Sequence, residues 1–172
     1  MSTCLVGSEM CIRDRVKLGI PSILDELAKA TNDIARGEII QLELSEKKES
    51  IKLNELLKVS YLKTGRLFEA SAKTGAMLAE KSSEEIKSFG LLGRSLGTAF
   101  QIKDDILDYA ALKFDTGKPA FKDFKEGKIT FPLYFAIQNA NSKERKFLLG
   151  KLGAKKITNK DQNKIYQLIH ND

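Results

Sequence analysis

The sequence has little of what several common kinds of enzyme and membrane protein require. Its 172 residues include no tryptophan, three prolines, two cysteines and a single histidine, His170. No Ser/His/Asp or Cys/His pair suggests a nucleophilic enzyme. No apolar run approaches the roughly eighteen residues of a membrane-spanning helix, so we expect no transmembrane segment. Cys4 and Cys11 both precede residue 16, and the cysteine-free remainder is compatible with a reducing cytosol.

The residues that are abundant favour an all-α fold. Leu, Ala, Lys and Glu dominate, and apolar residues recur at the three- and four-residue spacing of amphipathic helices. Ser82 with Glu85, and Thr158 with Asp161, predict capped helix starts. We expect helices over residues 21–44, 53–79, 82–111, 130–139, from a cap at Ser142 to 150 or 153, and 158–169, with loops over 45–50 and 113–127.

An acidic face stands out in the run FQIKDDILD at residues 100–108. At about 100° per residue, Gln101, Asp104, Asp105 and Asp108 share an arc of roughly 100° on one side of a helix. They lie near its C-terminal end, where the helix dipole disfavours anions, so a compensating cation is needed. Hard oxygen ligands of this kind suit Mg²⁺, which often shares its shell with substrate phosphates. A solvated acidic helix face is the alternative.

Two Gly-Lys steps follow this face in the next loop, at Gly117-Lys118 and Gly127-Lys128. Glycine frees the backbone there, and each lysine offers a mobile point charge for phosphate oxygens. Carboxylates followed by such lysines suggest binding of a diphosphate through a metal ion. Either lysine on its own would be interpreted as an ordinary exposed loop residue.

Several separated motifs together resemble the trans-type polyprenyl (isoprenyl diphosphate) synthase family. FQIKDDILD is similar to that family's second aspartate-rich motif, Phe-Gln-x-x-Asp-Asp-x-x-Asp. The other similar segments are Gly37-Glu38-x-x-Gln41-Leu42, Tyr61-x-Lys63-Thr64-x-x-Leu67-Phe68, Gly117-Lys118 and Asp123-x-x-Glu126-Gly127-Lys128-x-Thr130. Each is weak alone, but their order and spacing agree with the family from about Val16 onward.

The resemblance implies a fold, a reaction and a metal. The fold is an isoprenoid-synthase-type helical bundle around a central cavity. The reaction is condensation of an allylic diphosphate with isopentenyl diphosphate by a Mg²⁺-dependent prenyltransferase of isoprenoid biosynthesis. Asp104 and Asp105 would hold Mg²⁺ bridged to the allylic diphosphate, and Asp108 would complete or support that shell. A cytoplasmic enzyme that is a homodimer in its full-length form is also implied.

The same resemblance implies roles for residues outside the acidic face. Lys63, Lys118 and Lys128 would contact the diphosphate of the allylic substrate. Thr64 and Gln101 would line the reacting centre. Metals and lysines are needed there because ionisation of the allylic C–O bond leaves a diphosphate whose charge must be neutralised.

One family feature is missing from the sequence. The family carries a first aspartate-rich motif followed by paired arginines, whereas Asp104-Asp105 is the only adjacent aspartate pair here and no two arginines are adjacent. We therefore expect residues 16–172 to be a partial synthase domain, with an incomplete bundle that is inactive alone. Residues 1–15 have no helical period and resemble translated sequencing-adaptor DNA, so we interpret them as a non-native leader. Their basic residues follow the apolar stretch, unlike those of a signal peptide.

Two other functions remain open on the sequence. The first is a non-catalytic helical subunit of a prenyl synthase, although such subunits tend to lose the aspartate motifs. The second is a basic nucleic-acid-binding module, since the net charge is +6 and residues 113–172 hold thirteen Lys and Arg against six Asp and Glu. No zinc-finger or RNP motif is present and the lysines lack interleaved aromatics, so no nucleic-acid partner is expected.

Overall fold

The computed structural model describes residues 19–47, 50–110, 121–154 and 156–170. Within these ranges the regular structure is helical, and no strand is formed there. The helices are α2 (Pro21–Lys47), α3 (Leu53–Ser60), the π-helical turn η1 (Tyr61–Gly65), α4 (Arg66–Leu78), α5 (Ser83–Ala110), α6 (Lys122–Lys125), α7 (Phe131–Asn139), α8 (Ser142–Lys151) and α9 (Asn159–His170). The predicted leader at residues 1–15 lies outside the described residues.

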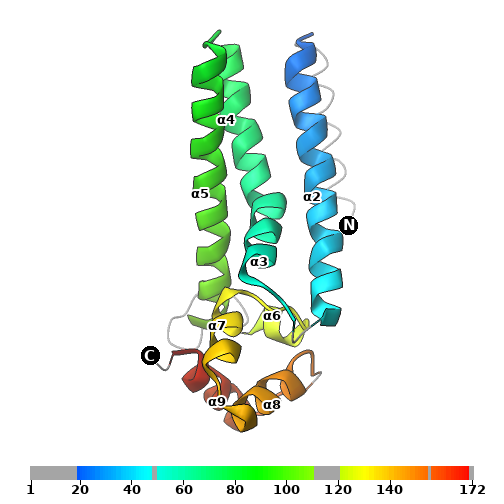
Figure 1. The fold of residues 1–172 in the computed structure, drawn as a ribbon, viewed down its shortest axis with the longest axis vertical. Coiled ribbons are helices and arrows are strands. Elements are labelled where there is room, and N and C mark those ends of the chain that lie inside the picture. Colours follow the sequence, from blue (N-terminus) through cyan, green and yellow to red (C-terminus); the bar gives the residue numbers. More distant parts are fainter. Residues whose placement is uncertain (1–18, 48–49, 111–120, 155, 171–172) are drawn as a thin grey trace.

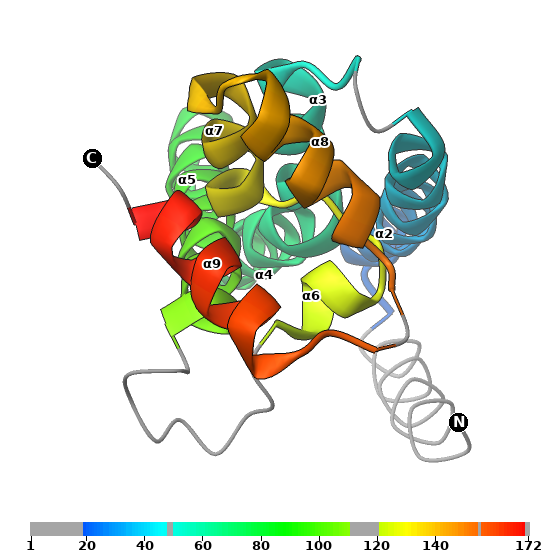
Figure 2. The ribbon, with the colours of Figure 1, turned by 90° about the horizontal axis from the view of Figure 1, so that it is seen from below.

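The long helices stand side by side, and the shorter ones close one end of them. In Figure 1, α2, the α3–η1–α4 rod and α5 run roughly parallel to the long axis of the molecule. Helices α6 to α9 gather below the lower end of these rods, and Figure 2 shows them from that end. The acidic segment of α5 therefore lies where the long helices meet the C-terminal layer.

Close backbone approach fixes how the long helices pack. A Cβ at Gly97 would lie 2.8 Å from the Cα of Gly65, so α5 and the π turn touch backbone to backbone. A Cβ at Gly37 would lie 2.9 Å from Cβ of Leu62, which brings α2 equally close on the other side. Glycine is required at these contacts because any side chain would push the helices apart. This packing places the π turn between α2 and α5.

The main apolar core lies at the end of the rods. Tyr109 of α5 packs edge-on against Phe121, with ring centroids 5.4 Å apart, and both side chains are fully buried. Leu133, Leu148 and Ile165 bring α7, α8 and α9 into the same cluster and are also fully buried. This core anchors the C-terminal layer against the aspartate-bearing end of α5.

One side of α5 presents large apolar side chains to solvent. Phe89, Leu92, Leu96 and Phe100 follow three- and four-residue spacing, and each is between 44% and 63% exposed.

None of the helices in the described ranges combines the length and the apolar character that a crossing of the bilayer requires.

The predicted helices are confirmed, with four local corrections. The loop predicted over residues 45–50 is partly wrong, because α2 continues to Lys47. The loop predicted over residues 113–127 is partly wrong, because Lys122–Lys125 form α6. Helix α8 is capped by Asn141 and not by Ser142, since the Asn141 side chain accepts hydrogen bonds from the backbone N–H groups of Lys143 and Glu144. The single helix predicted over residues 53–79 contains the π turn, which apolar spacing does not reveal.

Candidate functional site

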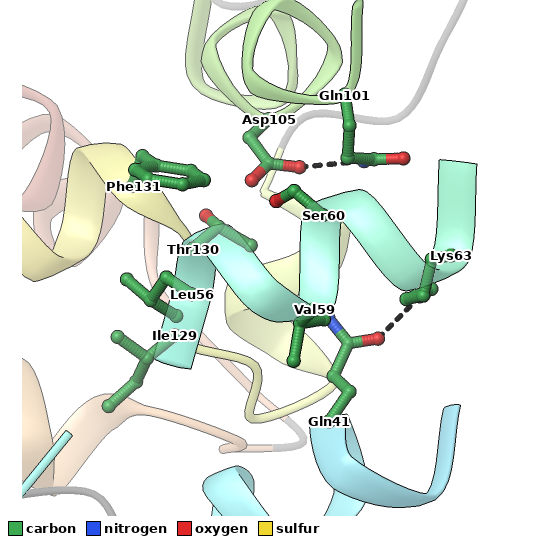
Figure 3. A pocket seen from close by; sticks show the side chains of 10 residues that line it. All are labelled: Gln41, Leu56, Val59, Ser60, Lys63, Gln101, Asp105, Ile129, Thr130 and Phe131. Atoms are coloured by element: carbon green, nitrogen blue, oxygen red, sulfur yellow. Dashed lines mark hydrogen bonds between the residues drawn. The ribbon is translucent and has the colours of Figure 1, made fainter. Parts of the chain in front are cut away.

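The site is built where α2, the π turn, α5 and the segment before α7 converge. It is a small pocket of about 20 Å³, with space for about one water molecule (Figure 3). Its lining residues are Gln41, Leu56, Val59, Ser60, Lys63, Gln101, Asp105, Ile129, Thr130 and Phe131. Apolar side chains form one wall of the pocket, and polar side chains from different helices form the opposite wall.

A chain of hydrogen bonds joins the π turn to the acidic face of α5. The Thr64 hydroxyl donates to Oε1 of Gln101 at 2.5 Å, and Nε2 of Gln101 donates to Oδ1 of Asp105 at 2.9 Å. Gln101 is thus oriented from both ends, with its amide oxygen towards Thr64 and its nitrogen towards the carboxylate. Three of the residues predicted for the site are brought together by this chain.

Asp105 is the most buried carboxylate of the face, with a relative exposure of 6%. Burial is the main reason that its pKa rises to about 6, and the charges of Asp123 and Asp104 raise it further. Hydrogen bonds from Gln101 and the Phe131 backbone oppose this rise. The ionised form of Asp105 is therefore disfavoured here, mainly by burial.

Asp104 is half-buried beside it on α5. Its charge also raises the pKa of Asp108 and of Asp123, after burial as the larger cause in each. Asp104 therefore contributes to a shared excess of negative charge at this end of the helix.

Asp108 has a structural task that the sequence did not indicate. Its two carboxylate oxygens accept the backbone N–H groups of Lys122 and Asp123, each at 3.1 Å. Asp108 also accepts, through its backbone carbonyl, the N–H of Phe121 at 3.1 Å. The residue thus ties the end of α5 to the start of α6, and this brings Asp123 close to the acidic face.

Lys63 reaches away from α5, towards α2. Its Nζ donates to Oε1 of Gln41 at 2.5 Å and lies 3.1 Å from Oε1 of Glu38 (Figure 3). The Lys63 side chain is 19% exposed, so it lines the pocket while remaining open to solvent at its tip. Two consecutive residues of the π turn, Lys63 and Thr64, therefore contact two different helices.

Lys128 is held by carboxylates of its own segment. Its Nζ lies 2.6 Å from Oε2 of Glu126 and 3.7 Å from Oδ1 of Asp123. Burial lowers the pKa of Lys128, but the hydrogen bond to Glu126 and the charges of Asp123 and Glu126 outweigh burial, so the pKa is raised. Lys118, the other predicted loop lysine, lies outside the described residues.

Asp123 is a site residue that sequence reasoning missed. Burial is the largest cause of its raised pKa, with Lys128 opposing the shift. Its charge acts on both Asp105 and Asp108. It heads the segment Asp123-x-x-Glu126-Gly127-Lys128, so that motif could have drawn attention to it. Gln41 and Glu38 were missed in the same way, although their motif was recognised.

The donor set suits Mg²⁺ in chemistry but does not form a complete metal site alone. Carboxylate oxygens are the ligands that Mg²⁺ prefers, and the raised pKa values of Asp105, Asp108 and Asp123 show negative charge that a divalent cation would relieve. Among the described residues, however, no group of three or more acidic, His or Cys side chains is close enough to hold a metal ion. The described residues therefore offer part of a coordination shell, which phosphate oxygens could complete.

Comparison with known proteins shows the family to which this chain belongs. The sequence profile of the family described as Polyprenyl synthetase matches residues 7–169. The chain belongs to the polyprenyl synthetase family, whose members are prenyltransferases of isoprenoid biosynthesis.

Curated relatives are similar but much longer. Octaprenyl diphosphate synthase of Escherichia coli is 39% identical over 131 residues, which cover 76% of this chain and 40% of that protein. Geranylgeranyl diphosphate synthase of Sulfolobus acidocaldarius is 32% identical over 148 residues, which cover 83% of this chain and 44% of that protein. The chain thus spans less than half the length of these relatives.

Solved structures share the fold. A polyprenyl synthase from Roseobacter denitrificans superposes with a TM-score of 0.84 at 32% identity, covering 98% of this chain and 56% of that chain. A polyprenyl synthase from Caulobacter crescentus, complexed with calcium and isoprenyl diphosphate, gives a TM-score of 0.82 at 34% identity, covering 90% and 47%. The architecture is therefore about half of an all-α isoprenoid synthase fold, as predicted.

Proposed function

We propose that this chain carries the allylic-diphosphate half of a Mg²⁺-dependent prenyltransferase that condenses an allylic diphosphate with isopentenyl diphosphate. The observation that supports this most is the hydrogen-bonded chain from Thr64 through Gln101 to Asp105. It places an alcohol, an amide and an under-neutralised carboxylate beside Lys63, on the motifs that resemble the family.

The chemistry requires a site that accepts a diphosphate and stabilises it as a leaving group. Bound Mg²⁺ would supply the charge that draws electrons from the breaking C–O bond. Asp104 and Asp105 are the carboxylates we propose to hold it. Because the pocket itself has space for about one water molecule, the diphosphate would lie across its mouth.

The lysines would complete the neutralisation. Lys63 is held by a neutral amide and an exposed carboxylate, and Lys128 by Glu126 and Asp123. A diphosphate carries more charge than any of these partners, so each ammonium would exchange its present contact for phosphate oxygens. Lys118 has the same proposed role on the basis of its Gly-Lys motif alone.

Thr64 and Gln101 would orient groups at the reacting centre. The hydroxyl of Thr64 and the amide of Gln101 fix each other, so neither has to be ordered when substrate binds. Asp108 would support the metal site indirectly, since it accepts the N–H groups that start α6 and so holds Asp123 near the metal-binding face.

We further propose that the 172 residues alone are inactive. The family's reaction uses two aspartate-rich motifs, and this sequence has only one adjacent aspartate pair. Half of the carboxylates that would clamp the diphosphate are therefore absent from it. The homodimeric full-length form and the cytoplasmic location are proposals that rest on family membership only.

The proposal is tested by titrating the protein with inorganic pyrophosphate in excess Mg²⁺ and in EDTA, using isothermal titration calorimetry. We expect binding that requires Mg²⁺ and weakens at least tenfold in Asp105→Ala and in Lys63→Ala, because each removes a charged contact worth about 1.5–3 kcal/mol. Asp25→Ala is the matched control, since Asp25 pairs with Lys29 on the exposed face of α2. Equal affinity in EDTA, or equal affinity in all variants, would contradict the proposal.

A further inference from the structure

The two site residues Lys63 and Thr64 lie in an unusual piece of backbone. The turn η1, Tyr61–Gly65, is π-helical, with α-helix on both sides of it. Such turns are rare, and they are frequently found at functional sites. Here the turn coincides with the point at which consecutive side chains reach α2 and α5.

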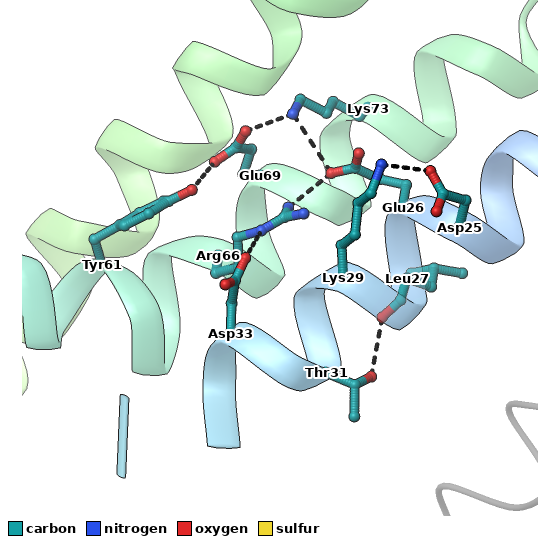
Figure 4. A network of polar contacts seen from close by, with 10 residues as sticks. All are labelled: Asp25, Glu26, Leu27, Lys29, Thr31, Asp33, Tyr61, Arg66, Glu69 and Lys73. Atoms are coloured by element: carbon teal, nitrogen blue, oxygen red, sulfur yellow. Dashed lines mark hydrogen bonds and ion pairs between the residues drawn. The ribbon is translucent and has the colours of Figure 1, made fainter. Parts of the chain in front are cut away.

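A network of polar side chains lies next to this turn, between α2 and α4. We call it the α2–α4 network, and its members are Glu26, Asp33, Tyr61, Arg66, Glu69 and Lys73 (Figure 4). Arg66 donates from Nη1 to Oε1 of Glu26 at 2.7 Å and from Nε to Oδ2 of Asp33 at 2.9 Å. One guanidinium therefore bridges two turns of α2.

The remaining contacts connect that bridge to the first residue of the π turn. The hydroxyl of Tyr61 donates to Oε2 of Glu69 at 2.7 Å. Lys73 pairs with Oε1 of Glu69 at 2.5 Å and with Oε1 of Glu26 at 3.4 Å. The turn is thus tied at Tyr61, where it begins, and at Arg66, the residue that follows its end.

The network is buried enough for its geometry to matter. The side chain of Arg66 is 6% exposed, and those of Glu26 and Glu69 are 13% exposed. Ion pairs that are shielded from water keep their geometry, because separating the partners would leave a buried, unpaired charge at a high cost in free energy. The pKa of Tyr61 rises to about 12, through burial first and then the hydrogen bond to Glu69, so its hydroxyl stays protonated as a donor.

The turn is also fixed from the α5 side. The guanidinium carbon of Arg94 lies 4.2 Å from the centre of the Tyr61 ring, a cation–π contact. A Cβ at Gly65, the last residue of the turn, would lie 2.7 Å from Oγ1 of Thr98. Tyr61 is therefore held by its hydroxyl through α4 and by its ring through α5.

We propose that Tyr61 and Arg66 are positioning residues, which hold the π turn in the register that points Lys63 at the diphosphate and Thr64 at the reacting centre. They touch no substrate themselves. This inference rests on the proposed function, because it assigns the network to the same site. It adds that the affinity of the site for diphosphate depends on the contacts that α2, α4 and α5 make at the two ends of the π turn.

The direct test is a double-mutant cycle between Tyr61→Phe and Lys63→Ala. Phenylalanine keeps the ring beneath Arg94 and removes only the hydroxyl. Circular dichroism first identifies a temperature at which all proteins are folded. There we expect Tyr61→Phe to bind Mg²⁺-pyrophosphate about fivefold more weakly, and the loss to vanish in the Lys63→Ala background.

Two controls separate positioning from general loss of stability. Tyr166→Phe removes a hydroxyl from α9, away from the network, and should leave the affinity unchanged. Arg66→Lys keeps the charge but cannot donate to Glu26 and Asp33 from two nitrogens of a planar group, so it should weaken binding as Tyr61→Phe does. An unchanged affinity in Tyr61→Phe, or the same fold loss with and without Lys63, overturns the inference.

An NMR measurement on the free protein tests the inference even if the protein does not bind pyrophosphate. In NMR spectra of the free protein, Tyr61→Phe should shift the Thr64 methyl and the Lys63 and Thr64 amide signals, and Tyr166→Phe should not. Absence of Mg²⁺-dependent pyrophosphate binding in the wild type refutes the proposed function, and the NMR result then decides the inference. Unchanged signals in Tyr61→Phe overturn the inference whatever the wild type binds.

Discussion

Replacing Asp105 by asparagine should stabilise the free protein while removing its affinity for Mg²⁺-diphosphate. Asp105 is buried, and its pKa is about 6 in place of the ordinary 3.8. Between about pH 4 and pH 6, the carboxyl group of Asp105 is therefore protonated in the folded state and ionised in the unfolded state. The free energy of unfolding must fall as the pH rises from about 4 to about 6, and it stays at the lower level above that interval.

The shift sets the size of the effect. At about 1.4 kcal/mol per pKa unit, a rise of about two units corresponds to at most about 3 kcal/mol of destabilisation at pH 8. Asparagine is neutral at every pH and can still accept from Gln101. Its amide nitrogen, however, is a poor substitute for the carboxylate oxygen that accepts from the Phe131 backbone. We therefore expect a net stabilisation of about 1–2 kcal/mol at pH 8.

The assay is urea denaturation of wild type and Asp105→Asn without Mg²⁺, at pH 8 and at pH 4.5. The difference should be present at pH 8 and nearly absent at pH 4.5, where the wild-type carboxyl is already protonated. Asp25→Asn, on an exposed ion pair, should change stability by less than about 0.5 kcal/mol at both pH values. A destabilised Asp105→Asn at pH 8, or an equal gain at both pH values, would refute the reasoning.

Three further predictions concern packing, capping and activity. Gly97→Ala should lower the free energy of unfolding by about 1–3 kcal/mol in thermal denaturation, because the added Cβ would lie 2.8 Å from Cα of Gly65. Gly75→Ala is the control and should cause no loss of stability, because a Cβ there would have nothing within 4 Å. Equal effects at the two glycines would contradict the packing of α5 on the π turn. Asp108→Ala should lower the free energy of unfolding by about 1 kcal/mol and speed hydrogen exchange of the Lys122 and Asp123 amides, because it removes the acceptor of both N–H groups. Unchanged exchange rates would contradict this role of Asp108. The 172-residue chain should give no detectable product from isopentenyl diphosphate and farnesyl diphosphate in a radiolabel assay. Clear turnover would show that the family's first aspartate-rich motif is dispensable.

Local sequence patterns predicted most of the fold because they report local physics. Periodic apolar residues and the caps at Ser82 and Thr158 specify helices through neighbouring groups, and both caps form as expected. The π turn was missed because apolar spacing does not distinguish a π turn from α-helix. The close approaches of Gly37 and Gly65 to neighbouring helices and the buried pairing of Arg66 are tertiary contacts that local patterns do not report.

The sequence predicted which face of the helix carries the candidate site residues, but not how these residues are connected to the rest of the fold. Helical spacing put Gln101 and Asp105 on one face, and the structure joins them by a hydrogen bond. The same spacing put Asp108 on that face, but it did not indicate that the Asp108 carboxylate oxygens accept the backbone N–H groups at the start of α6. That contact spans fourteen residues and depends on where the chain returns to α5, which no local pattern encodes. Asp123 was missed for the same reason.

The central claim is that the acidic end of α5 binds diphosphate through Mg²⁺ with Lys63 and Lys128 beside it. A crystal structure of this chain grown with Mg²⁺ and pyrophosphate tests it most directly. The account predicts a metal about 2.1 Å from a carboxylate oxygen of Asp104 or Asp105, with pyrophosphate oxygens completing its shell and contacting both lysines. Pyrophosphate bound elsewhere, or an ordered site with Lys63 still on Gln41 and no metal at the aspartates, would contradict it.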